Sequence, residues 1–189
     1  MKETVRGFKM DEASKEPQEV NEVFNWYKEN FGFVPNLGKV LSVAPAALRS
    51  YWLTQLQLQQ YGVLTPEEQN IVQMTIAVEN QCNYCTAGHH MIGNTFFGSK
   101  EEDLQALRAK SKLSTEKFDA LKTFTLQVYN HKGRVSDTAL DAFLVQGYTK
   151  AQAVEVVTNI AVKVLSNFTN QLVLTEIDEP LLAFAEKVQ

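Results

Sequence analysis

Residues 65–90 read TPEEQNIVQMTIAVENQCNYCTAGHH, and the rest of the chain is organised around this stretch. Its opening letters form a capping box with proline at the first helical position, which predicts a helix start. Apolar residues follow at helical spacing as far as about Gln81. After a short break, a second predicted helix carries both cysteines of the protein, Cys82 and Cys85, and ends near Gly98.

The same helical spacing continues on both sides of this stretch, with glycine and proline between the periodic segments. Further capping boxes are predicted at residues 99–102 and 149–152. No segment alternates like a strand, and no Asn-Gly or Asp-Gly hairpin turn occurs. We therefore predict an all-α fold of about nine helices with no sheet. Residues 1–16 are expected to form a flexible polar arm, and residues 17–189 a single helical domain.

Composition narrows the possible partners. The chain has 189 residues with a net charge of -4, and no basic block suggests nucleic acid or a membrane surface. No apolar run resembles a signal peptide or a membrane span. We therefore expect a cytoplasmic protein that binds neither nucleic acid nor membrane. In a reducing compartment, two cysteines three positions apart are more often catalytic or metal-binding than structural.

The chemistry of the cysteine stretch follows from its spacing. On a helix, Cys82, Cys85 and His89 lie within about 60° of one face, whereas His90 lies off that face and Tyr84 points nearly opposite. A cysteine at the helix start can pair with the second as a disulfide, and free N–H groups there favour thiolate. An imidazole one turn further can exchange protons. The pattern predicts a redox-active dithiol with a local acid–base group.

Other interpretations of these residues remain open at this stage. The cysteines could be inert buried thiols, or they could hold zinc with His89 and a fourth ligand such as Glu79 or His131. Glu79, three residues before Cys82, is predicted either to orient His89 or polarise a thiol, or to be a solvated carboxylate at a helix end. For His131 and His90, an ordinary surface or core position is favoured over a functional one.

The motif of residues 82–89, C-x-x-C-x-x-x-H, resembles the signature of the alkylhydroperoxidase D-like (AhpD-like) proteins in the carboxymuconolactone decarboxylase superfamily. The runs at 33–37, 133–137 and 165–170 resemble its peroxidase-related branch, so the similarity covers about residues 30–178. The resemblance implies an all-helical fold, assembly as homo-trimers or hexamers, and reduction of hydroperoxides or disulfides without a cofactor. An external dithiol, lipoyl- or thioredoxin-like, would be the reductant.

By the same resemblance, Cys85 attacks the peroxide, Cys82 resolves it from a position nearer to solvent, and His89 belongs to a proton relay. The relay glutamate of the family falls at position 70, where this chain has Asn70, which cannot accept a proton at neutral pH. Either Glu67 or Glu79 would have to replace it, or the site would function without such a carboxylate. Thiol–disulfide exchange is therefore ranked above peroxide reduction. The alternatives are a carboxymuconolactone decarboxylase-type lyase and a non-enzymatic zinc-binding module.

Overall fold

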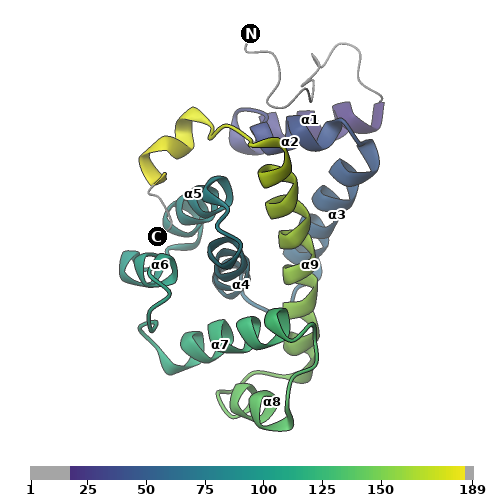
Figure 1. Ribbon diagram of the computed structural model, residues 1–189. Coiled ribbons are helices and arrows are strands. Elements are labelled where there is room, and N and C mark those ends of the chain that lie inside the picture. The colour runs from purple at the N-terminus through teal and green to yellow at the C-terminus, as the bar shows by residue number, and fades with distance from the viewer. Residues whose placement is uncertain (1–17, 186–189) are drawn as a thin grey trace.

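The computed structural model describes residues 18–185, and within that range the chain forms helices and no strand (Figure 1). The nine α-helices there confirm the all-α prediction. They are α1 (Gln18–Phe31), α2 (Asn36–Ser42), α3 (Pro45–Tyr61), α4 (Pro66–Glu79), α5 (Asn83–Ile92), α6 (Glu101–Arg108), α7 (Glu116–Asn130), α8 (Asp137–Leu144) and α9 (Lys150–Val173). A π-helix, η3 (Gly93–Phe97), continues α5, and a 3-10 helix, η4 (Glu179–Phe184), follows α9. The predicted arm at residues 1–16 lies outside the described residues.

Helix α4 is the centre of the molecule. It packs against α5, α6, α7 and α9, which surround it in Figure 1. Every side chain in residues 70–78 is buried, so α4 lacks the exposed polar face of an ordinary surface helix. Its polar side chains must therefore find partners inside the protein.

Two apolar clusters share α4. One joins α4 to α6, α7, α8 and α9. The other is built mainly from α1, α2, α3 and α5, and it includes Ala77 of α4 together with both cysteines. The cysteine pair therefore lies inside the second apolar core. Among residues 18–185, no helix has the length and apolar character needed to cross a membrane.

Two of the three predicted capping boxes are present. At the start of α4, the Thr65 hydroxyl accepts from the Glu68 N–H while the Glu68 carboxylate accepts from the Thr65 N–H. Thr149 and Gln152 form the same reciprocal pair at the start of α9. These bonds satisfy N–H groups that the first helical turn leaves without partners.

The capping box predicted at residues 99–102 is wrong. Helix α6 begins one residue later than that pattern requires, with Lys100 at the N-cap and no side-chain capping bond. The Ser99 N–H instead donates to the Gly93 carbonyl, which closes the π-helix through Gly98 at a φ of 64°. Ser99 thus belongs to the end of the preceding helix, and its buried hydroxyl has no hydrogen-bond partner.

This difference between capping positions can be measured. Thr65→Ala should lower the free energy of unfolding by about 1 kcal/mol, since it removes the capping bond at the start of the central helix. Ser99→Ala is the matched control and should be neutral or slightly stabilising, because its hydroxyl caps nothing. Urea unfolding of the two variants measures the contrast, and equal losses would contradict this assignment of the caps.

Candidate redox site

The junction between α4 and α5 places the first cysteine. Gln81 has a left-handed φ of 54°, and the N–H groups of Gln81 and Cys82 donate back to the Val78 and Ala77 carbonyls. This is a Schellman ending with glutamine where glycine is usual. It turns the chain so that Cys82 becomes the N-cap of α5, with its sulfur accepting from the Cys85 N–H at 3.4 Å.

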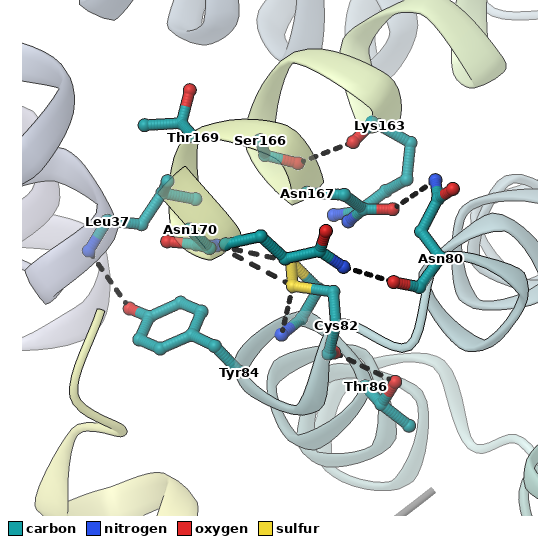
Figure 2. The surroundings of a disulfide bond; sticks show 12 residues. Leu37, Asn80, Cys82, Tyr84, Thr86, Lys163, Ser166, Asn167, Thr169 and Asn170 are labelled. Atoms are coloured by element: carbon teal, nitrogen blue, oxygen red, sulfur yellow. Dashed lines mark hydrogen bonds between the residues drawn. A yellow bond between two sulfur atoms is a disulfide. The ribbon is translucent and has the colours of Figure 1, made fainter. Parts of the chain in front are cut away.

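Cys82 and Cys85 form a disulfide, with their Cα atoms 5.3 Å apart. Asn170 of α9 donates its amide to Cys85 Sγ at 3.2 Å and lies 3.9 Å from Cys82 Sγ (Figure 2). Cys82 is 2% exposed and Cys85 is 3% exposed, so Cys82 does not lie nearer to solvent as the family resemblance implied. The Asn170 amide and the start of α5 supply donors that stabilise thiolate after reduction.

The hydrogen bonds of His89 determine which ring nitrogen carries the proton. Asn70 of α4 donates its amide to the His89 carbonyl at 3.2 Å, so its side-chain oxygen faces His89 Nδ1 at 2.7 Å. An oxygen acceptor at this position requires a proton on Nδ1. The free lone pair on Nε2 then accepts from the Lys163 Nζ of α9, 2.6 Å away.

Burial determines the charges of His89 and Lys163. It lowers the pKa of Lys163 from 10.5 to about 7, because the ammonium loses its hydration inside the protein. Burial also lowers the pKa of His89 well below its usual value, and the positive charge of Lys163 adds to that effect. His89 is therefore a neutral imidazole at pH 7, whereas Lys163 passes between amine and ammonium near that pH.

Cys85, His89 and Lys163 are polar or reactive residues that line a cavity of about 110 Å³, and Cys82 is not part of its lining. The other walls are apolar or aromatic. They include Tyr27, Phe31, Phe33, Leu37, Tyr51, Tyr84, Met91, Ile92 and Leu181. A small apolar molecule in this cavity would therefore meet the sulfur of Cys85 next to an acid–base pair.

Tyr84 takes part in this cavity although its place on the helix suggested that it points away. Its hydroxyl donates to Asp178 at 2.5 Å and accepts from the Leu37 N–H at 3.2 Å. Asp178 also accepts from the Asn36 N–H. The tyrosine thus joins α5 to the start of α2 and to the segment after α9, and Leu37, Tyr84 and Leu181 from these parts of the chain line the cavity.

Glu79 is not among the residues that line the cavity. Its carboxylate pairs with Lys110 at 3.1 Å, and its side chain is 30% exposed. The hydrogen bonds of the His89 ring go to Asn70 and Lys163 rather than to Glu79 or Glu67. The geometry therefore supplies no contact for the orienting role predicted for Glu79, nor for Glu67 or Glu79 in place of the relay carboxylate.

The remaining histidines have other partners. His90 accepts from Arg108 and contacts Glu101, and its ring packs on Phe184. His131 is exposed and bonds the Gln127 carbonyl. Within residues 18–185, no three His, Cys, Asp or Glu side chains gather as they would around a metal ion.

Sequence reasoning missed Lys163, Asn170 and Asp178. A signal for the first two was present, because Val156, Ile160, Lys163 and Asn170 recur at helical spacing along one face of α9, and all four are buried. A lysine on an inward face is costly and therefore marks a functional candidate. Nothing local singled out Asp178, whose partners are more than 90 positions away.

Comparison with solved structures identifies the fold. No family model matches the sequence, and no curated protein matches it. The AhpD core of an uncharacterized peroxidase-related protein from Ralstonia eutropha JMP134 is similar at a TM-score of 0.83 and 20% identity, over 94% of this chain and 95% of that one. An uncharacterized peroxidase-related protein from Silicibacter sp. TM1040 reaches 0.79 at 14% identity, over 100% and 97% of the two chains.

A third similar structure is the debrominase Bmp8, with a TM-score of 0.74 and 18% identity over 95% of this chain and 96% of that one. A cysteine-to-alanine variant of Bmp8 has also been solved in complex with 2,3,4-tribromopyrrole. At these identities the likeness shows the fold. The chain therefore has the AhpD-like helical fold that its cysteine motif predicted, and this fold also carries a debrominase.

The buried lysine has a consequence for stability. Between pH 7 and pH 10.5 the unfolded chain holds a proton on Lys163 that the folded chain has released, so this residue makes stability rise with pH across that window. Below about pH 7 the full cost of burying the ammonium is present. Lys163→Met should therefore stabilise the protein by a few kcal/mol more at about pH 6 than at about pH 10.

Urea unfolding at both pH values measures this difference. The variant also loses the hydrogen bond to His89 at both pH values, and any part of that bond that depends on the ammonium is already contained in the pKa of Lys163. Lys150→Met, at an exposed position of the same helix, is the control and should show no such pH-dependent gain. A gain for Lys163→Met that is equal at both pH values would contradict the lowered pKa.

Proposed function

We propose that the protein is a thiol-dependent oxidoreductase that reduces organic hydroperoxides or disulfides through Cys82 and Cys85. One observation carries this proposal. Cys85 lies in a disulfide at a helix start and also lines an apolar cavity beside a buried imidazole and amine. These are the parts that a dithiol needs in order to attack a small electrophile and manage the protons.

The reaction starts from the reduced pair. The Cys85 thiolate attacks one oxygen of the O–O bond, so that an S–O bond forms, the O–O bond breaks, and the alkoxide leaves as an alcohol after taking a proton. Cys82 then attacks the sulfur of the resulting sulfenic acid, releases water and forms the disulfide. With a disulfide substrate, the same attack produces a mixed disulfide that Cys82 resolves.

The position of the two sulfurs supports this division of roles. Cys85 lines the cavity, whereas Cys82 does not and lies at the loop that joins α4 to α5. The apolar walls favour an organic hydroperoxide over hydrogen peroxide, because a bulky apolar group gains from leaving water. An external lipoyl- or thioredoxin-like dithiol would complete the cycle. Since Cys82 is only 2% exposed, the approach of this dithiol to Cys82 requires a local opening of the protein.

Assembly as a homo-oligomer belongs to the same proposal. Helix α9 carries exposed apolar side chains at Val154, Val157, Phe168 and Leu172, which are 50–69% exposed in the single chain. Such a row supports burial against another copy. The trimer or hexamer suggested by the family resemblance would cover this face, and light scattering of the purified protein would measure the mass.

Reductive debromination of a small aromatic ring is a second candidate. The observation that favours it is the set of aromatic side chains around the cavity, together with the debrominase among the similar structures. In this reaction the dithiol would be oxidised to the disulfide while a C–Br bond is replaced by C–H and bromide and a proton are released. Bromide release from 2,3,4-tribromopyrrole by the reduced protein tests it.

The cysteine variants test the main proposal. Cys85→Ser should reduce the consumption of cumene hydroperoxide, with a dithiol as donor, to the uncatalysed rate, because the attacking sulfur is lost. Without an added thiol, reduced Cys82→Ser should consume about one hydroperoxide per chain and stop as the sulfenic acid, because it has no resolving partner. The assay follows peroxide loss together with the mass of the oxidised protein.

Turnover by Cys85→Ser at the parent rate would refute this mechanism. Conversion of a muconolactone that survives loss of both thiols would instead support the lyase alternative, which does not depend on a cysteine pair. Stoichiometric zinc in protein purified without chelator would support the zinc-binding alternative.

A further inference from the structure

We propose that Lys163 is the acid–base group of the redox site: its amine takes the proton of the Cys85 thiol, and its ammonium returns that proton to the leaving group. His89 is then a positioning residue that holds the amine at the cavity. The identity of the leaving group rests on the proposed function, whereas proton transfer from the thiol does not.

The placement of Lys163 is the first argument. Its side chain is 2% exposed, and it lines the cavity together with Cys85. Its Nζ lies 2.6 Å from His89 Nε2, and burial alone accounts for its lowered pKa, with no carboxylate among the described residues contributing to it. A buried lysine without a counter-charge is costly to keep, and such lysines serve as bases because their amine form is available near neutral pH.

The surroundings of His89 are the second argument. A carboxylate at position 70 would stabilise a protonated imidazole, but Asn70 is neutral and only accepts from Nδ1. Protonation of Nε2 would also place an imidazolium against the ammonium of Lys163. His89 therefore stays neutral, and the proton that a relay would place on the histidine resides on Lys163 instead. In a carboxylate–histidine pair, a negative partner stabilises a positive imidazole. Here the partners of the imidazole are the neutral Asn70 and Lys163, which itself carries the positive charge.

Among the residues that line the cavity, no other titratable group fits this role. The elements packed against α9 are α2, α3, α4, α5 and α7. Of these, α2, α4 and α7 contribute no titratable side chain to the cavity lining. Besides Lys163, five titratable residues line the cavity, and they are Cys85, His89, Tyr27, Tyr51 and Tyr84. Burial raises the pKa of each tyrosine, so all three stay protonated at neutral pH.

The protons balance through one cycle. The Cys85 S–H proton moves to the Lys163 amine, which leaves a thiolate beside an ammonium. The thiolate attacks the hydroperoxide, and the ammonium gives its proton to the departing alkoxide and becomes an amine again. The proton of the Cys82 thiol accompanies the hydroxide that leaves the sulfenic acid as water. The hydroperoxide is the oxidant, and an external dithiol restores both thiols.

The first test needs no substrate. In a Cys82→Ser background, alkylation of Cys85 by iodoacetamide is measured across pH for the parent, Lys163→Met and Lys150→Met. Loss of the neighbouring ammonium should shift the midpoint of the alkylation rate in Lys163→Met to a pH about one unit or more higher. It should also slow alkylation at pH 7 about tenfold. Lys150→Met should follow the parent. A profile for Lys163→Met that matches the control overturns the proposal.

The second test separates proton donation from a purely electrostatic effect. A general acid matters most when the leaving group is strongly basic. With the cysteine pair intact, Lys163→Met should therefore slow the reaction of the reduced protein with cumene hydroperoxide about tenfold more than its reaction with dithiodipyridine, which releases a stable thiopyridone. Equal slowing of both reactions would show that Lys163 supplies charge only and would overturn its role as acid.

Replacing a buried ammonium with methionine removes a desolvation cost, so the variant is expected to fold. Lys163→Gln, which keeps an N–H donor on a side chain one bond shorter, is the second variant and should behave like Lys163→Met, because an amide cannot take up or release the proton. If the parent protein does not reduce cumene hydroperoxide, the peroxide part of the proposed function fails, while the alkylation profile still decides the role of Lys163.

Discussion

The burial of α4 on all sides is the constraint on which the rest of the structure depends. A helix in this position cannot leave polar side chains in contact with water, so each one needs a partner from a neighbouring element. Gln73 bonds Asn159 of α9, and Asn70 bonds His89 of α5. These bonds fix how α5 and α9 lie against α4, and the candidate redox site is formed where the three helices meet.

Charge at the site follows from that burial. Because Asn70 is neutral, the histidine beside it has nothing to stabilise a positive charge. The positive charge therefore lies on Lys163, whose pKa of about 7 allows it to hold or release a proton under ordinary conditions. The site thus has the two sulfurs and the imidazole that the AhpD-like motif predicts, and the imidazole is paired with a lysine of α9 rather than with a carboxylate of α4.

The elements that could be predicted from the sequence are those set by local interactions. The start of α4 at Thr65, the break before Cys82 and the nearly continuous run of helices all depend on neighbours within a few positions. The prediction was wrong at Ser99 because the π-helical end of the preceding segment competes for the same residue. Similarly, Tyr84 was set aside on the basis of one helix, although segments distant in sequence bring Asp178 and Leu37 to its hydroxyl.

The sequence by itself determined the all-α class, the main helix starts and the juxtaposition of Cys82 with Cys85, because helical spacing and capping are short-range effects. It also showed that the expected carboxylate is absent at position 70. The residue that contacts the other nitrogen of His89 is set by the tertiary structure. Lys163 is 74 positions from His89, and the distance between them depends on how α9 packs against α4 and α5, which no local pattern encodes.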